Sequence, residues 1–182
     1  MVNIARNTLV FAFAFLLLGM NACLAEDKVA PSVCKVVINA SPAVVYDVIR
    51  SLRETMGKNV KELSKTSEQT MVEETFHVLP VIGKAICVYK ETYVPDKQVA
   101  YKLVRSDRFK AFEGKWTITR CNTGKTELAL SSYVDTGINH IPFAKQITRM
   151  ETKKGIKKRL AAVKKIAEKK QIAMAKQTGK KM

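Results

Sequence analysis

The chain has 182 residues, of which 47% are hydrophobic and 26% charged, and its formal net charge is +16. Without the short leader described next, this length fits one domain that can bury a sufficient hydrophobic core without disulfide bonds. The charge alone would suggest a nucleic-acid-binding protein, but it is unevenly placed. From residue 145 onward there are fourteen cations and two acids, a net charge of +12, which leaves +4 for the rest. The body is nearly balanced and the carboxyl-terminal segment carries the charge.

The amino-terminal 25 residues have the build of a secretory signal peptide. One cation, Arg6, precedes an apolar run over residues 9–20, and small residues follow at Cys23 and Ala25. The run is shorter than the roughly 20 residues that a membrane-spanning helix needs. We therefore expect cleavage after Ala25 and a periplasmic or secreted mature protein. A lipoprotein, cut before Cys23 and acylated there, ranks second because residues 20–22 fit that processing poorly.

Residues that could carry chemistry are few. His77 and His140 stand in no spacing typical of metal ligands or of a nucleophile and its base, so we interpret them as structural. Cys34, Cys87 and Cys121 have no close pair and are an odd number, which favours buried thiols and leaves any disulfide pairing open. The sequence has no glycine-rich phosphate loop, paired carboxylate motif or CxxC. It therefore predicts no catalytic residue, metal or cofactor.

In chain order, the first predicted element is a strand. The β-branched run over residues 33–40 indicates a strand, and Ser41-Pro42 predicts a helix start, with an N-cap serine and proline at the first helical position. We expect that helix to end near Gly57. Segments of strand length then follow without intervening helices, which indicates an antiparallel meander. They cover residues 60–67, 70–79, 84–94, 99–105, 112–121 and 126–135.

Beyond Pro142 the apolar period becomes helical. Apolar residues recur at three- and four-residue steps with a slip near Gly155: Phe143, Ile147, Met150, Ile156, Leu160, Val163 and Ala167. The pattern predicts one helix over about residues 143–176, on the order of 50 Å long at 1.5 Å per residue. A domain of this length is only about 35 Å across. We therefore expect the basic end of the helix to project beyond its domain.

The order of elements resembles the START and polyketide-cyclase superfamily. Residues 35–49 (KVVINASPAVVYDVI) are similar to its opening strand and capped helix, and residues 93–101 (YVPDKQVAY) to its central hairpin. Residues 114–118 (GKWTI) and 126–135 (TELALSSYVD) are similar to its last two strands, and Ile141-Pro142 to the start of its final helix.

That resemblance implies the α+β helix-grip fold, a seven-stranded antiparallel sheet wrapped around a long C-terminal helix. The ligand-binding domain would cover residues 26–167, between the signal peptide (1–25) and a basic helical tail (168–182). The family implies a cavity between sheet and helix that binds a hydrophobic small molecule such as a lipid, sterol, quinone or polyketide. Only some of its branches are enzymes.

Candidate cavity residues come from the strand faces and the helix seam. Trp116 alternates with Phe112 and Gly114, so these residues share the inward face of one strand, and Gly114 leaves room above the sheet for a ligand. In segment 84–94 two faces compete, one with Cys87, Tyr89 and Tyr93, the other with Ile86, Val88 and Val94. For any single residue, core packing is the simpler explanation. The predicted ligand-binding residues are Phe76, Val78, Val88, Tyr101, Leu103, Phe112, Trp116, Leu130, Ile147 and Met150.

The basic segment indicates a membrane partner. Lys145, Arg149, Lys153 and Lys157 form a stripe at four-residue steps, which suits an anionic membrane surface. Nucleic acid would attract the same charge, but the export signal argues against it. We therefore expect a non-enzymatic periplasmic carrier that docks on the membrane through its tail. Two alternatives stay open: a cyclase- or aromatase-type enzyme using the same cavity, and a nucleic-acid-binding or stress protein with a vestigial cavity.

Overall fold

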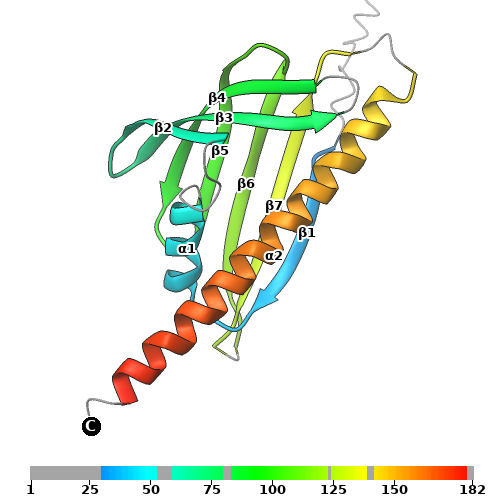
Figure 1. The fold of residues 1–182 in the computed structure, drawn as a ribbon. Coiled ribbons are helices and arrows are strands. Elements are labelled where there is room, and N and C mark those ends of the chain that lie inside the picture. Colours follow the sequence, from blue (N-terminus) through cyan, green and yellow to red (C-terminus); the bar gives the residue numbers. More distant parts are fainter. Residues whose placement is uncertain (1–29, 53–58, 80–82, 123, 139–141, 180–182) are drawn as a thin grey trace, which may run out of the picture.

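The structure is a computed structural model that describes residues 30–52, 59–79, 83–122, 124–138 and 142–179 (Figure 1). The expected signal peptide and His140 lie outside the described residues. The described elements, in chain order, are β1 (Ser32–Ile38), α1 (Pro42–Ser51), β2 (Val60–Lys65), β3 (Gln69–Leu79), β4 (Gly83–Val94), β5 (Gln98–Ser106), β6 (Ala111–Arg120), β7 (Thr126–Asp135) and α2 (Ala144–Gly179).

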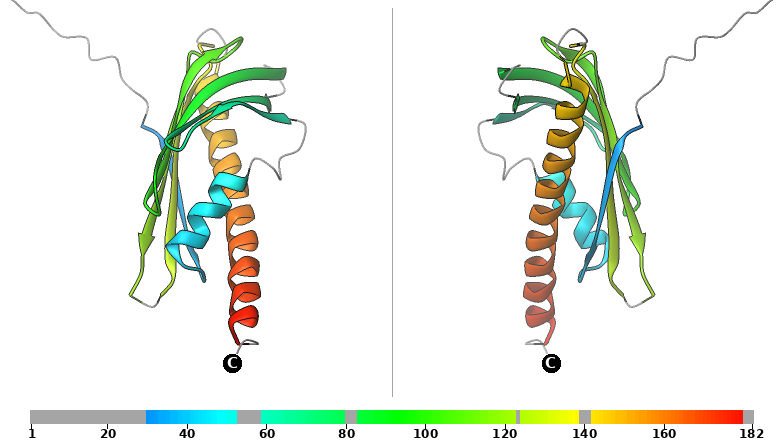
Figure 2. Two further views of the ribbon diagram at one scale, coloured as in Figure 1. Left: turned by 90° about the vertical axis from the view of Figure 1, so that its left-hand side faces the viewer. Right: turned by 90° about the vertical axis from the view of Figure 1, so that its right-hand side faces the viewer.

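The strands form one antiparallel sheet in the order β1-β7-β6-β5-β4-β3-β2. Strands β2 to β7 pair with their neighbours in sequence, and β1 pairs with β7 at the far edge. Short turns join the central strands, and at one of them Asp96 adopts a positive φ of 57°. Both helices lie on the same side of the sheet, and β3 and β4 curve over toward α2 (Figure 2). The predicted helix-grip fold is confirmed.

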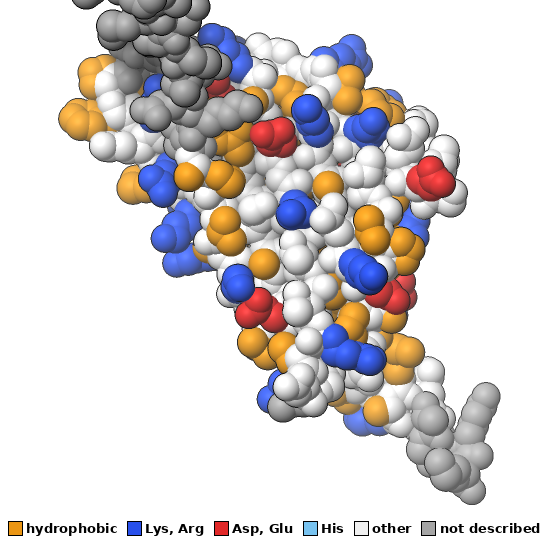
Figure 3. Space-filling view, turned by 180° about the vertical axis from the view of Figure 1, so that it is seen from behind, with side chains coloured by type: hydrophobic (Ala, Val, Ile, Leu, Met, Phe, Trp, Pro, Cys, Tyr) orange, Lys and Arg blue, Asp and Glu red, His pale blue; other side chains and the backbone are white. Residues whose placement is uncertain are grey.

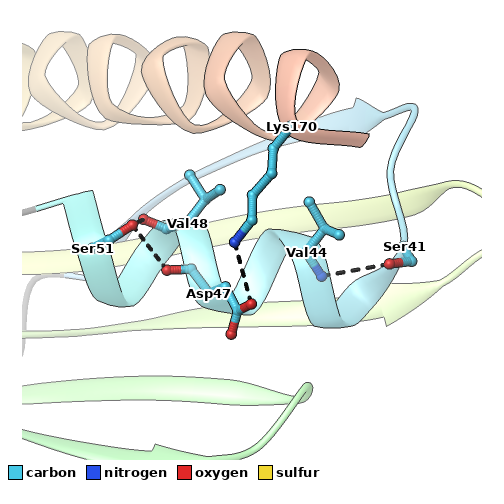
Figure 4. Close-up of polar contacts among 6 residues, drawn as sticks. All are labelled: Ser41, Val44, Asp47, Val48, Ser51 and Lys170. Carbon is cyan, nitrogen blue, oxygen red and sulfur yellow. Dashed lines mark hydrogen bonds and ion pairs between the residues drawn. The ribbon is translucent and has the colours of Figure 1, made fainter. Parts of the chain in front are cut away.

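The first helix has a defined start and a defined end. The side chain of Ser41 accepts a hydrogen bond from the backbone N–H of Val44 at 3.4 Å and caps the amino end of α1 (Figure 4). At the other end, the hydroxyl of Ser51 donates to main-chain carbonyls three and four residues earlier. Such bonds compete with the helical ladder. The described helix ends at Ser51, and the expected end near Gly57 falls within residues 53–58, which lie outside the described residues.

The core lies between the inner face of the sheet and the two helices. Within β4, Ala85, Cys87 and Tyr89 are buried and Ile86 and Val94 are exposed, but Val88 is buried as well, because a register shift with β5 interrupts the alternation there. The outer face of the sheet shows apolar side chains scattered between lysines, arginines and acids (Figure 3). The largest fully buried apolar side chains, all less than 2% exposed, are Ile38, Leu128, Leu130, Val45, Val48, Val72, Val99 and Val163.

The buried stripe of α2 differs from the predicted seam at its amino end. Downstream of Gly155 the expected apolar residues are buried, but Phe143 is 71% and Met150 64% exposed. The inward positions one and two turns before Ile156 are Thr152, which is half-buried, and Thr148, which is 6% exposed. An apolar pattern cannot find this part of the stripe because its members are threonines.

The distal half of α2 is attached to the turn between β1 and α1. Backbone N–H groups of residues 39 and 41 donate to the Oε1 atoms of Glu168 (3.0 Å) and Gln171 (3.1 Å). Lys170 forms an ion pair with Asp47 at 3.3 Å (Figure 4). Beyond these contacts the end of α2 projects past the strands (Figures 1 and 2). Neither described helix combines the length and apolar character needed to cross a membrane.

Candidate ligand-binding cavity

A cluster of five aromatic rings forms the apolar part of the site. Phe112 on β6 lies at its centre, with ring-centroid distances of 4.8 Å to Tyr101, 5.1 Å to Phe76, 5.3 Å to Tyr89 and 6.4 Å to Phe109. All four pairs are tilted or edge-to-face, which are favourable ring geometries. The rings come from β3, β4, β5, β6 and the connection before β6, so the curvature of the sheet brings them together.

A cavity of about 310 Å³ lies between this cluster, β7 and the first half of α2. Its floor is aromatic and aliphatic, and its polar groups come from Ser132 and from residues 151–159 of α2. The lining residues are Phe76, Tyr101, Phe109, Phe112, Leu130, Ser132, Val134, Glu151, Thr152, Lys154, Gly155, Ile156, Lys158 and Arg159.

A buried ion pair joins the helix to the sheet at one side of the cavity. The guanidinium Nη2 of Arg159 donates to Oε1 of Glu74, and the Tyr89 hydroxyl donates to Oε2 of the same carboxylate at 2.8 Å. The Glu74 side chain is 4% exposed, whereas 28% of the Arg159 side chain is exposed. The Arg159 guanidinium also lies 5.8 Å from the centre of the Phe76 ring. Both oxygens of the buried carboxylate therefore have hydrogen-bond donors, as a buried charge requires.

The environment keeps the nearby tyrosines protonated. Burial raises the pKa of Tyr101 to about 12, a rise that the Ser132 side chain partly offsets. Burial and the neighbouring Glu74 charge raise the pKa of Tyr89 well above its usual value. For Arg159, burial lowers the pKa, but the charge and hydrogen bond of Glu74, together with the two nearby tyrosines, outweigh burial, so the net pKa is raised. At neutral pH the cavity therefore presents a neutral phenol and a charged guanidinium.

Tyr101 fills the room that we expected Gly114 to leave for a ligand. The two residues are partners in the β5–β6 register. A Cβ atom at position 114 would overlap the Tyr101 hydroxyl and the backbone carbonyl oxygen of Ser131. The glycine is needed because the tyrosine ring lies across β6, so it shapes the cavity floor and offers no separate space.

The structure brings four predicted ligand-binding residues together around the cavity. Phe76, Tyr101, Phe112 and Leu130 all line it, each from a different strand. Their contact with a ligand stays a prediction. Their common feature is an inward position on a strand at the end of the sheet nearest the start of α2.

The other predicted residues lie elsewhere. Trp116 is 4% exposed and belongs to the packed core, two residues along β6 from Gly114. Val88 is buried beside the register shift between β4 and β5, and Leu103 is half-buried against the core. Ile147 is half-buried but outside the lining, and Met150 points to solvent. The side chain of Val78 lies outside the described residues.

Sequence reasoning missed the helical wall and the connection before β6. Phe109 follows a polar turn and belongs to no apolar pattern that would mark it as inward-facing. Its position is fixed by a hydrogen bond from its backbone N–H to Ser106 Oγ at 3.1 Å. Thr152 and Arg159 are polar, and an apolar seam does not include them. Projection of the helical period backward from the buried Val163, by four and by eleven residues, would have placed both on the inward face.

The described residues offer no metal site, since no group of three or more His, Cys, Asp or Glu side chains among them is close enough to hold an ion. The cysteines at positions 34, 87 and 121 are free thiols. Burial raises the pKa of Cys87 to about 11, which makes it a weak nucleophile at neutral pH. The chemistry of the cavity therefore comes from its apolar floor, Tyr101, Ser132 and the cations of α2.

The fold of the chain is that of several solved structures. A protein from Thermus thermophilus, TTHA0849, has a TM-score of 0.63 at 14% identity, covering 75% of this chain and 96% of that one. The Zhui aromatase/cyclase from a Streptomyces species gives 0.62 at 15% identity, with 76% and 93% covered. A START superfamily protein from Mycobacterium smegmatis gives 0.56 at 13%, with 80% and 99% covered.

No family model and no curated protein sequence matches the chain. At these identities the structural likeness establishes the helix-grip fold, as found in START and polyketide cyclase-like proteins.

Proposed function

We propose that the protein binds a hydrophobic small molecule in the cavity between the sheet and α2. The observation that carries this proposal is the 310 Å³ cavity floored by the aromatic cluster. Ligand pockets usually measure about 300–1,000 Å³ and are mostly apolar with a few polar groups. The cavity lies at the small end of that range, so it suits a compact ligand such as a quinone ring or a short polyketide-like molecule. A sterol or a two-chain lipid would be enclosed only in part.

A pair of substitutions on β6 tests this assignment. Phe112→Leu removes the ring at the centre of the cavity floor, whereas Trp116→Phe shortens a core side chain that does not line the cavity. We expect compact apolar ligands, titrated by calorimetry, to lose affinity for the first variant and to keep it for the second. Equal affinities for both folded variants would exclude this cavity as the binding site. Mass spectrometry of co-purified small molecules would identify the ligand.

We favour carriage over catalysis, with a cyclase- or aromatase-type enzyme as the second candidate. The second candidate draws support from the polar side of the cavity, where Tyr101, Ser132 and Arg159 face the same space. The neutral phenol of Tyr101 could donate a hydrogen bond to a carbonyl oxygen of a polyketide-like substrate. The likeness to an aromatase/cyclase points in the same direction. Release of an unchanged ligand supports a carrier, whereas recovery of a cyclised product supports the enzyme.

The proposed location is the periplasm or the medium. It is supported by the charged, apolar and small residues that follow one another in residues 1–25. The intact mass of the exported protein should correspond to a chain that begins at Glu26. A chain that retains Met1 and stays in the cytosol would contradict this proposal, and a diacylated Cys23 would support the lipoprotein alternative.

Docking on an anionic membrane is the last part of the proposal. Lys145, Arg149, Lys153 and Lys157 are all exposed on α2, and each cation near an anionic surface contributes about 1 kcal/mol. This stripe runs past the cavity, whereas the end of α2 lies on the order of 30 Å farther along the helix at 1.5 Å per residue. Membrane contact through the stripe would therefore hold the cavity near the lipid, and the tail would add charge at a distance.

A further inference from the structure

The helical wall of the cavity is positively charged. Four charged side chains of α2 line it: Glu151, Lys154, Lys158 and Arg159. Three are cations and one is an acid, while the sheet side of the lining, from Phe76 to Val134, contributes no charge. The wall therefore has an excess of positive charge facing an uncharged floor.

The cations differ in how far they are neutralised. Lys154 forms an ion pair with Glu151 at 3.7 Å, but its side chain is 79% exposed, so the pair is weak. Within the described part of the chain Lys158 forms no ion pair. Arg159 is bound to Glu74 through one nitrogen, and a guanidinium carries five N–H donors in a planar fork. Lys158 supplies uncompensated charge, and Arg159 supplies oriented donors.

The geometry points to a specific class of ligand, and this inference rests on the proposed function. We infer that the cavity selects amphipathic anions, namely compact aromatic or aliphatic acids with one carboxylate. Their apolar body would lie on Tyr101 and Phe112, and their carboxylate would lie toward Lys158 and Arg159. A planar carboxylate matches the planar donors of arginine. A neutral ligand of the same shape would leave the charged wall without a partner.

Two isosteric probes test the preference. 2-Naphthoate and 2-naphthamide have the same ring system and nearly the same size, but only the first is charged at pH 7. We expect wild-type protein to bind the acid roughly tenfold more tightly in calorimetric titrations at low salt, because hydrogen bonds to charged groups are stronger than neutral ones. Equal affinities would overturn the inference and leave the proposed cavity standing. Absence of binding by both probes would overturn the proposed function as well.

A charge-matched pair of variants locates the preference on the cavity wall. Lys154→Gln/Lys158→Gln removes two cations that line the cavity, and Lys153→Gln/Lys157→Gln removes two exposed cations from the adjacent face of the same helix turns. Both variants lower the net charge by two and should fold normally, since exposed substitutions change stability by only about 0.5 kcal/mol. We expect the first variant to lose most of its preference for 2-naphthoate through weaker binding of the acid, with Arg159 and the apolar floor still in place. The second should keep the preference, and an equal loss in both would show that general attraction by net charge explains it.

Discussion

Tyr101 lies across Gly114, its register partner on the neighbouring strand, and its ring occupies the space that a side chain at position 114 would need. The predicted consequence concerns Gly114→Ala. The added methyl group meets both the tyrosine hydroxyl and the backbone of Ser131, and only the first of these can move. We expect a loss of about 1–3 kcal/mol in the free energy of unfolding, measured by urea titration, together with weaker ligand binding.

Gly155→Ala is the matched control, because an added Cβ there meets no atom within 4 Å. Alanine is favoured over glycine inside a helix by about 0.8–1.0 kcal/mol, so this variant should be more stable than wild type. If both substitutions changed stability in the same direction, the close approach of Tyr101 would not be the cause.

A second prediction concerns the ion pair between Glu74 and Arg159. Glu74→Gln keeps the size of the side chain but leaves the guanidinium without its counter-charge. Breaking a buried pair costs about 3–5 kcal/mol, and we expect a value near or below the lower limit because 28% of the Arg159 side chain is exposed. Denaturant unfolding at pH 7 measures it. The comparison variant is Glu151→Gln, whose exposed partner Lys154 implies a loss of less than about 1 kcal/mol.

The overall fold was accessible from the sequence because its signals are local. Alternating β-branched and aromatic residues, turns such as Pro95-Asp96 and the Ser41-Pro42 cap each specify one element, and the predicted strands correspond to β1–β7. With no helix predicted between the segments that form β2 and β7, an antiparallel meander is the simple arrangement. The long helix that the following apolar period predicts then has to cover one face of the sheet.

The site was accessible only in part, because apolar pattern does not identify a cavity. Inward-facing strand residues were found, but the pattern cannot separate Phe112, which lines the cavity, from Trp116, which packs in the core. Gly114 was recognised as unusual, yet its partner depends on the register between β5 and β6. The helical wall was missed because Thr152 and Arg159 are polar at inward positions, and the exposed Met150 was assigned to the seam in their place.

The raised tyrosine pKa values predict a loss of stability at alkaline pH. A folded-state pKa of about 12 for Tyr101 means that the folded protein keeps a proton that the unfolded chain, with a pKa near 10, has released. The stabilisation is therefore complete below about pH 10 and is lost as the pH rises toward 12. Urea unfolding between pH 8 and pH 11 should show the decline. Tyr101→Phe should reduce its slope above pH 10 and leave the slope below pH 9 unchanged.

A fourth prediction separates the packed part of α2 from its projecting end. A chain that ends after Gln171 keeps the hydrogen bonds and the ion pair that tie α2 to residues 39–47. Its free energy of unfolding should stay within about 0.5 kcal/mol of wild type. A chain that ends after Ala167 loses these contacts and should be less stable by about 1–2 kcal/mol, since each hydrogen bond contributes about 0.5–1.5 kcal/mol. Equal stability of the two chains would place the boundary of the domain at residue 167, as the sequence predicts.

The chain that ends after Gln171 also tests whether the projecting end tethers the protein to membranes. Removal of residues 172–182 takes away Lys176, Lys180 and Lys181, each contributing about 1 kcal/mol if it reaches an anionic surface. Co-sedimentation with vesicles that contain an anionic lipid should therefore show affinity lower by roughly tenfold or more. Binding of the full chain should fade as salt shortens the screening length from about 10 Å at 0.1 M to about 3 Å at 1 M.

The control is the full-length variant with Lys176, Lys180 and Lys181 all changed to Gln. It should behave like the truncated chain, because the charge and not the helix is the proposed cause. Undiminished vesicle binding by both would mean that the stripe along the first half of α2 is sufficient, and that the tail has another role.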